Sequence, residues 1–295
     1  MRESSRSARA RIEHETQRLG SRVSRRDLLR VLAGASLLPF VPLFGGAGGC
    51  SGSEPGTSGS DAGSSVDQSG SSSSGDWASG GTASMVAKAS YPDPFTGALS
   101  ACALVATTTE GPCTTATDLL RQDISEGWTG LPVRLALQVV DTSCKPLSGV
   151  TVKVWHTNRE GSYSGQTPNN GMCLKQQSYS SQDFFRGVQT TDASGKVFFD
   201  GCFPGWYRGR AVHIHFQVKN GATSYRVSQL FFPEDITADI FATHSEYKEY
   251  GQPDTVFSND NIMAGIPVAQ RDRHILAVAR MNDGAMLASK VVTVA

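Results

Sequence analysis

Short stretches of alternating hydrophobic and polar residues recur throughout the C-terminal part of the chain. In residues 132–141 (PVRLALQVVD) apolar side chains occupy alternate positions from Val133 to Val139, which is typical of a half-buried strand. Turn sequences such as SCKPLSG, DASG and NGAT separate the stretches. The other expected strands lie within residues 149–157, 190–201, 210–220, 224–234, 274–280 and 285–294.

These short strands show no βαβ rhythm, and this predicts the fold class. We expect an all-β protein, a β-sandwich of mainly antiparallel strands with long loops around the functional site. Helix is expected only in short pieces near residues 117–124 and 235–247.

The chain divides into three parts by composition. Residues 51–84 are almost entirely Ser, Gly and Asp, with Trp77 as the only aromatic residue. Such a stretch buries too little apolar surface to offset its ordering entropy. We therefore predict a signal over residues 1–49, a disordered tether over 50–88 and one globular domain over 89–295.

The N-terminal part has the features of an export signal. Arg25 and Arg26 precede an apolar stretch over residues 28–44, which resembles a twin-arginine signal. Pro39 and Pro42 interrupt this stretch, and it is short for a membrane span. We expect the protein in the periplasm or at the cell surface. The AGGC sequence resembles a lipoprotein box with Cys50 as a lipid anchor; a cleaved signal with an incidental cysteine is the alternative.

Charge and cysteine content narrow the function classes. The 27 acidic and 27 basic residues give a formal net charge of zero, so no nucleic-acid partner is expected. No cysteine belongs to a C-x-x-C pair, and an exported domain permits disulfides. We expect one or two bridges, with open connectivity, among Cys102, Cys113, Cys144, Cys173 and Cys202.

The stretch WYRGRAVHIHF carries candidate metal-binding chemistry. His213 and His215 are two residues apart, so on a strand both imidazoles share one face and suit one metal ion. No acidic residue follows them closely, but Tyr207 lies six residues before His213. Only a strongly acidic metal deprotonates a phenol near neutral pH, so this set favours Fe(III) over zinc. Taken singly, each of these residues also fits an ordinary surface or rim position.

Three stretches together resemble the intradiol ring-cleavage dioxygenases, the catechol and protocatechuate type, in their exported single-domain branch. They are GVTVKVWHTNREGSYSG, FRGVQTTDASGKVFFDGCFPGWYRGRAVHIHFQV and SQLFFPED. The resemblance implies a non-haem Fe(III) enzyme that adds both atoms of dioxygen to a catechol between its hydroxyl-bearing carbons, giving a cis,cis-muconate. It implies Tyr163, Tyr207, His213 and His215 as iron ligands, Tyr207 also as a base, and Arg210 and Gln229 as further catalytic residues.

A second class of function also fits the strand pattern. Transthyretin-like and pilin-type sandwich modules share the strand-turn-strand rhythm, so a metal-free carrier or binding module tethered at the surface is the alternative. The pattern leaves the particular catechol and the oligomeric state open.

Overall fold

The computed structural model describes residues 76–99 and 101–295. The expected export signal, Cys50 and residues 50–75 of the expected tether lie outside the described residues. The description below concerns the described part alone.

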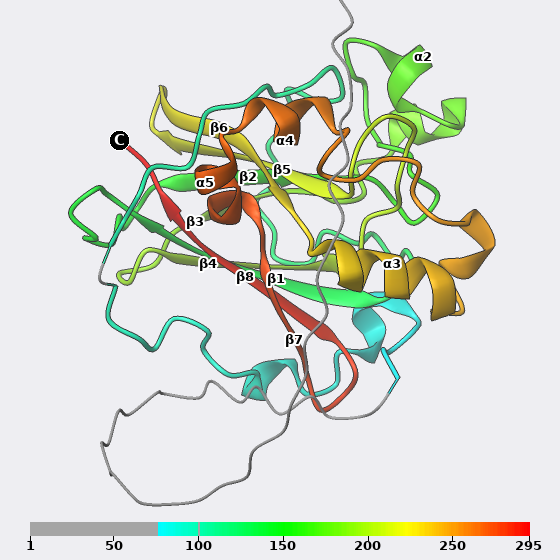
Figure 1. Ribbon diagram of the computed structural model, residues 1–295, viewed down its shortest axis with the longest axis horizontal. Helices are drawn as coiled ribbons and strands as arrows, with labels where there is room; N and C mark the ends of the chain where they lie inside the picture. Colours follow the sequence, from blue (N-terminus) through cyan, green and yellow to red (C-terminus); the bar gives the residue numbers. More distant parts are fainter. Residues whose placement is uncertain (1–75, 100) are drawn as a thin grey trace, which may run out of the picture. The chain divides into compact units, whose positions relative to one another are not determined.

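Two four-stranded sheets form the body of the domain (Figure 1). One sheet has the order β4 (Lys196–Cys202), β1 (Pro132–Val140), β8 (Met286–Thr293), β7 (Ala277–Arg280). The other has the order β3 (Arg186–Thr190), β2 (Thr151–Trp155), β5 (His213–Asn220), β6 (Thr223–Phe231).

Pairing in both sheets is mainly antiparallel. The pair β1–β8 is parallel, with Val133 opposite Met286, and the remaining pairs between these strands are antiparallel. Apolar side chains from both sheets, including Leu135, Val152 and Phe216, meet in one core. The predicted all-β sandwich is thus confirmed.

Helices are short and lie in the connections. They are α2 (Asn170–Cys173), α3 (Glu234–Thr243), α4 (Asn261–Gly265) and α5 (Val268–Arg271), with 3-10 turns η2 (Gly81–Ser84), η3 (Lys88–Ser90), η4 (Gln177–Ser181), η5 (Lys248–Tyr250) and η6 (Asp272–His274). Helix α3 overlaps the stretch 235–247 where a helix was expected, and it begins one residue earlier.

The helix expected near residues 117–124 is wrong. The segment runs extended beside β3 and β4: Leu120 bridges Val188, Asp123 bridges Asp200, and the N–H of Ile124 donates to the carbonyl of Asp200 at 2.8 Å. The Ile124 side chain is 2% exposed in the core. Docking on strands thus satisfies the backbone groups that a helix would otherwise have paired internally.

The segment just before residue 89 packs on the domain, which differs from the expected tether. Gly81 donates its N–H to the carbonyl of Gly130 at 2.8 Å, and Met85 is 3% exposed. Gly81 has φ +72°, and a Cβ there would overlap the carbonyl oxygen of Trp128. Residues 76–88 are therefore specified by contact with the domain despite their composition.

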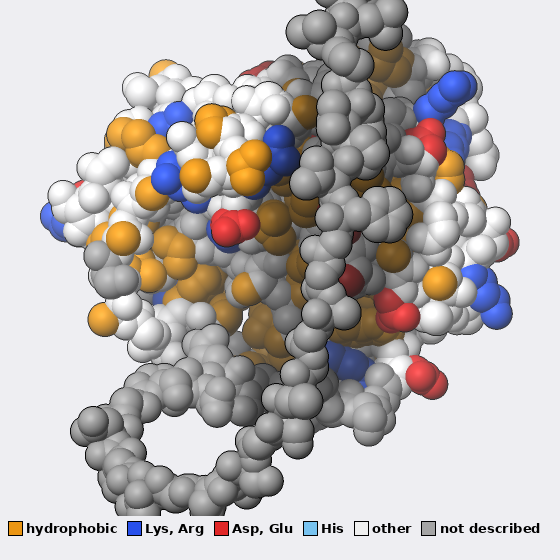
Figure 2. All heavy atoms as spheres, viewed as in Figure 1, with side chains coloured by type: hydrophobic (Ala, Val, Ile, Leu, Met, Phe, Trp, Pro, Cys, Tyr) orange, Lys and Arg blue, Asp and Glu red, His pale blue; other side chains and the backbone are white. Residues whose placement is uncertain are grey.

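Two disulfides cross-link the domain, in agreement with the expected one or two. They join Cys102 to Cys144 and Cys113 to Cys173, while Cys202 is free and buried. Within the described residues, no helix has the length and apolar character needed to cross a bilayer. On the face seen in Figure 2, Lys and Arg side chains are scattered among acidic, apolar and neutral ones.

Candidate metal centre

Strand β5 places His213 and His215 on the outer face of its sheet. Ile214 and Phe216 alternate with them and belong to the main core, so the two imidazoles point the opposite way. His215 pairs in register with Trp155 of β2, and its ring stacks on the indole with centroids 5.0 Å apart and 6° between the planes. The two imidazoles therefore lie side by side, as the spacing predicts.

A glycine turn delivers Tyr163 to the same place. Gly161 has φ +79°, and a Cβ there would overlap the carbonyl oxygen of Trp206, so the turn requires glycine. The Asn158 side chain accepts the N–H of Ser162 at 2.9 Å, and this bond closes the turn. The position of Tyr163 is consequently set by a turn that is closed by a side-chain hydrogen bond.

A second turn delivers Tyr207. The turn is closed between Tyr207 and Arg210, where the N–H of Arg210 donates to the carbonyl of Tyr207 at 3.3 Å. Gly209 within the turn has φ +81°. Tyr207 is half-buried, whereas Tyr163 is 2% exposed. Tyr207 is thus the more accessible of the two phenols.

Four donor atoms converge where these elements meet. The distances are 3.1 Å from His213 Nε2 to His215 Nε2, 3.2 Å from His215 Nε2 to Tyr163 Oη, 3.3 Å from Tyr207 Oη to His213 Nε2, and 3.4 Å from Tyr163 Oη to both Tyr207 Oη and His213 Nε2. All four residues that the sequence indicated as ligands are brought together.

The spacing fits donors that share one metal ion. Atoms bound to a metal at about 2.0–2.2 Å lie about 2.8–3.6 Å apart for angles between right and tetrahedral. His213 Nδ1 is 2.6 Å from the carbonyl of Ala211, and since a carbonyl only accepts, Nδ1 carries the proton and Nε2 presents its lone pair to the centre. The described residues contain no group of three or more His, Cys, Asp or Glu able to hold a metal. The donor set at this centre consists of two imidazoles and two phenols.

Burial controls the protonation states of the four donors. Burial raises the pKa of Tyr163 well above its usual value. It also raises the pKa of Tyr207, although the charge of Arg210 partly lowers it. Burial, followed by the charge of Arg210, lowers the pKa of His213 to about 3; burial, followed by His213, lowers the pKa of His215 well below its usual value. Without a cation the set is neutral, so a metal that binds as a phenolate complex must displace protons.

Arg210 lies beside the four donors and is held from two sides. Its Nε donates to Asp260 Oδ2 at 2.9 Å, and its Nη2 donates to Gln229 Oε1 at 2.5 Å. Gln229 stands opposite His215 in the β5–β6 register. The structure thus brings Arg210 and Gln229 together next to the predicted ligands.

Asp260 is the residue that sequence reasoning missed. It is fully buried and also accepts the N–H groups of Ala211, Ile262 and Met263 at 2.8–2.9 Å. Burial raises the pKa of Asp260, but the bonds from Met263 and Arg210 more than offset this, so its pKa lies below the usual value. The available signal was an Asp at the N-cap of a short helix, which alone indicates only a helix start.

A cavity of about 540 Å³ opens over the donors. Residues of α2 and α4 line it, and both helices lie on the same side of β5 and β6 in Figure 1. The Cys113–Cys173 disulfide forms part of its wall. The residues lining the cavity are Thr109, Gly111, Pro112, Cys113, Gly161, Tyr163, Met172, Cys173, Tyr207, Arg208, Arg210, His215, Asn261 and Ile262.

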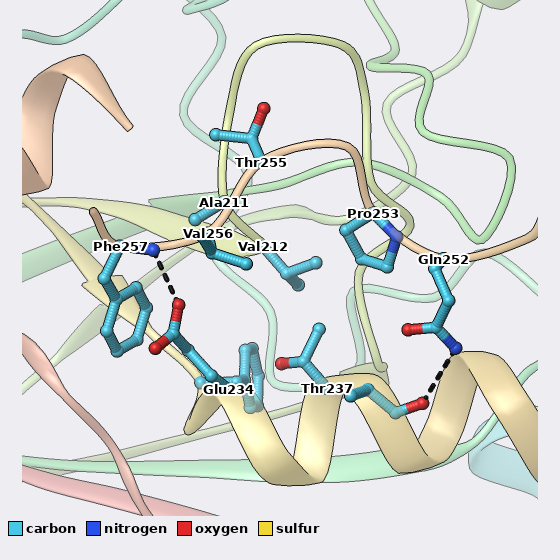
Figure 3. Close-up of a pocket in the computed structure, with 11 residues that line it drawn as sticks. Ala211, Val212, Glu234, Thr237, Gln252, Pro253, Thr255, Val256 and Phe257 are labelled. Carbon is cyan, nitrogen blue, oxygen red and sulfur yellow. Dashed lines mark hydrogen bonds between the residues drawn. The ribbon is translucent and has the colours of Figure 1, made fainter. Parts of the chain in front are cut away.

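A smaller cavity of about 60 Å³ lies between α3 and the loop after η5. In Figure 3 Glu234 and Thr237 of α3 face this loop, and Glu234 Oε1 accepts the N–H of Phe257 at 2.6 Å. Binding a single benzene ring takes a cavity of about 150 Å³. This hollow is therefore too small for an aromatic substrate.

Comparison with known proteins identifies the class. A family model described as Dioxygenase matches residues 107–286, and the chain resembles an intradiol ring-cleavage dioxygenase from Tetranychus urticae in structure. The chain belongs to the intradiol ring-cleavage dioxygenase family. In a search of curated proteins, no sequence matches it.

The solved structures give the extent of the likeness. The Tetranychus urticae enzyme is 25% identical with a TM-score of 0.57, and the match covers 65% of this chain and 94% of that one. The dioxygenase domain of a dioxygenase carbohydrate-binding fusion from Streptomyces sp. SirexAA-E is 21% identical with a TM-score of 0.47, covering 65% and 97%. Catechol 1,2-dioxygenase from Pseudomonas arvilla C-1 is 22% identical with a TM-score of 0.43, covering 64% and 61%.

Proposed function

We propose that the protein is a non-haem Fe(III) dioxygenase that cleaves a catechol-type ring between its two hydroxyl-bearing carbons and forms a cis,cis-muconate-type product. The observation that carries this proposal is the convergence of two phenol oxygens and two imidazole nitrogens beneath an open cavity, each of them within 3.4 Å of at least two of the others. Family membership supports the same reaction class. The alternative of a metal-free sandwich module has no support in the comparisons.

Tyr163, Tyr207, His213 and His215 would hold the iron. Phenolate is a hard oxygen donor and suits a strongly acidic cation, and neutral imidazole suits iron. When bound, ferric iron would chelate both hydroxyl oxygens of a catechol and make its ring reactive toward dioxygen. The protein supplies the fixed donor positions on β5 and on the two turns.

Tyr207 is proposed as the base that accepts a catechol proton at Oη. A catechol loses two protons when both of its oxygens bind a metal, so a proton acceptor is needed beside it. Tyr207 lines the cavity on a turn and is half-buried, whereas Tyr163 is 2% exposed. The more accessible phenol is therefore the one suited to exchange a proton with substrate.

Arg210 is proposed to stabilise negative charge that develops on the ring during the reaction. It lines the cavity, and Asp260 and Gln229 fix its guanidinium. A charge that is already oriented and partly shielded from water needs no reorganisation when the substrate charge develops. Gln229 donates through Nε2 to the carbonyl of Thr109 at 3.1 Å, so its own orientation is fixed as well.

The test is a visible absorption spectrum of the full chain loaded with iron, before and after addition of catechol in air. We expect a broad phenolate-to-iron band that shifts with catechol, followed by muconate absorbance. The Tyr207→Phe variant should keep its iron and lose most turnover. A protein that stays colourless after ferric loading, with no muconate formed, would refute the proposed function.

We also propose that the domain acts outside the cytoplasm. Arg25 and Arg26 before the apolar N-terminal stretch support this proposal, as do the two disulfides, which form in oxidising compartments. Replacing both arginines by lysine should retain the protein in the cytoplasmic fraction, and Cys50→Ala tests the lipid anchor by membrane partitioning. Unchanged export of the double lysine variant would contradict the twin-arginine route.

A further inference from the structure

The cavity over the donors has a buried floor and an exposed mouth. His215 and Tyr163 on the floor are each 2% exposed, whereas Met172 of α2 is 69% exposed and Arg208 is exposed. A volume of about 540 Å³ falls in the range of cavities that bind drug-sized molecules, about 300–1,000 Å³. A single catechol ring on the floor therefore leaves much of the cavity free toward the mouth.

The charge of the lining is positive. Arg208 and Arg210 line the cavity, and no Asp or Glu is among its lining residues. Arg210 is engaged by Asp260 and Gln229. Arg208 sits at the turn tip and has no carboxylate within ion-pair distance among the residues that the structure describes.

Asp254 acts on Arg208 through its charge, without an ion pair between the two side chains. The Oδ1 atom of Asp254 accepts the N–H of Gly209 at 3.1 Å and the hydroxyl of Thr255 at 2.6 Å. Asp254 does not line the cavity. The guanidinium of Arg208 is therefore available to a ligand that enters through the mouth.

Apolar side chains complete the outer part of the cavity. Pro112, Met172 and Ile262 line it together with the Cys113–Cys173 disulfide. Such a surface suits the carbon chain of a substituent, whereas the guanidinium of Arg208 suits a carboxylate. Both features describe a single ligand: an aromatic ring with an extended acidic side chain.

We propose that Arg208 is a specificity residue that binds the anionic end of an extended catechol, a dihydroxyphenyl ring with a carboxylate-ended side chain. This inference rests on the proposed function, because it assumes that the ring occupies the floor. It adds a substrate class that the four donor residues do not define.

Two substrates with the same ring and chain test the proposal. They are 3-(3,4-dihydroxyphenyl)propionate, which is anionic, and its methyl ester, which is neutral. The readout is the ratio of kcat/KM for the acid to that for the ester, measured with the iron-loaded full chain as wild type, Arg208→Gln and Arg208→Glu. Lys145→Gln and Lys145→Glu are the matched controls, because Lys145 is exposed in the turn between β1 and β2 and does not line the cavity.

We expect wild type to prefer the acid, and the preference to weaken as salt is added. The ratio should fall about fivefold in Arg208→Gln and about 20-fold in Arg208→Glu, as for a partly exposed ion pair that is removed and then reversed. The Lys145 variants should keep the wild-type ratio. Dissociation constants for both compounds, measured without oxygen, should show the same change in ratio, which places the effect in binding.

The outcomes separate the two proposals. If wild type cleaves both compounds with no preference for the acid, or if the ratio is unchanged in both Arg208 variants, the Arg208 proposal is wrong and the dioxygenase function stands. If the iron-loaded wild type cleaves no catechol at all, the proposed function is wrong, and the Arg208 proposal, which depends on it, is wrong as well.

Discussion

The two faces of the sheet that contains β5 are equally buried but chemically opposite. The inner face carries Val154, Ile214 and Phe216, each at most 2% exposed, in the apolar core. The outer face carries His213 and His215, which are 3% and 2% exposed under the covering loops. Alternate residues of the same strand thus serve packing on one side and chemistry on the other.

The two faces are equally buried, but the outer face carries buried polar side-chain atoms that lack a hydrogen-bond partner within the described part of the chain. On the outer face, His215 Nδ1 and Trp155 Nε1 are buried without a hydrogen-bond partner among the described residues. Buried polar atoms without partners are uncommon in folded proteins because desolvation is costly. His215 carries one of these atoms and is also one of the four donors, so its place at the site comes at some cost in stability.

The largest expected effect comes from exchanging one residue on each face of β5. His215→Ala should remove a ligand, reduce iron content severely and lower kcat/KM about 100-fold or more. Ile214→Val should cost about 0.5–1.5 kcal/mol of unfolding free energy and leave iron content unchanged. Metal analysis, ring-cleavage rates and urea titration of both variants check this contrast. Full iron content and activity in His215→Ala would show that the outer face is not the metal site.

The next largest effect concerns the support of Arg210. Asp260→Asn keeps an N-cap residue for α4 but removes the charge that pairs with Arg210. We expect a loss of about 3 kcal/mol of unfolding free energy, because a buried ion pair is broken, and a roughly tenfold to 100-fold lower kcat.

A double-mutant cycle separates positioning from general damage. If Asp260 acts through Arg210, then Asp260→Asn should lower kcat/KM only slightly further in an Arg210→Gln background. Additive losses in the double variant would assign Asp260 a purely structural role.

The sandwich and three of the donor residues, Tyr207, His213 and His215, could be predicted from local patterns in the sequence, whereas Tyr163 was indicated only by the resemblance to the intradiol dioxygenases. Alternation predicts strands, and a His-x-His pair on a strand necessarily shares one face. The role of Asp260 could not be predicted because its partner Arg210 lies far away in the sequence, and only the tertiary packing of α4 brings the two residues together. The helix expected near residues 117–124 failed for the same reason, since Ile124 gains more from the core than from local helix bonds.

The two disulfides extend the comparison to the loops that cover the outer face. Their sequence separations are 42 for Cys102–Cys144 and 60 for Cys113–Cys173, so loop-closure entropy predicts a similar loss of about 4 kcal/mol when either is removed. Only the second bridge lines the cavity, and the carbonyl of Cys173 accepts the N–H of Tyr163 at 3.0 Å.

Replacing each pair by alanine should therefore give equal stability losses and unequal kinetics. We expect KM to rise about tenfold for the Cys113→Ala, Cys173→Ala variant and to stay near wild type for the Cys102→Ala, Cys144→Ala variant, measured below both melting transitions. Equal KM values in the two variants would mean that the cavity wall holds its shape without the bridge.

The smallest expected effect is a pH dependence from a histidine on the inner side. His156 is 3% exposed against the Phe185 ring, and burial lowers its pKa to about 4. Its unfolded value is about 6.5, so between pH 6.5 and 4 the unfolded chain binds more protons than the folded one at this residue. Stability from this residue is therefore complete above pH 6.5 and falls as the pH drops, by at most about 1.4 kcal/mol per unit.

His156→Gln should flatten this dependence while lowering stability at pH 7, because glutamine does not titrate and fits the site less well. Urea titrations of wild type and variant at pH 7, 5.5 and 4.5 would measure the slope, with iron removed so that His213 and His215 contribute equally to both proteins. Parallel slopes would mean that His156 has the same pKa in the folded and the unfolded chain. The acid sensitivity of this fold would then come from other groups whose pKa is lowered in the folded protein, among them His213, His215 and Asp260.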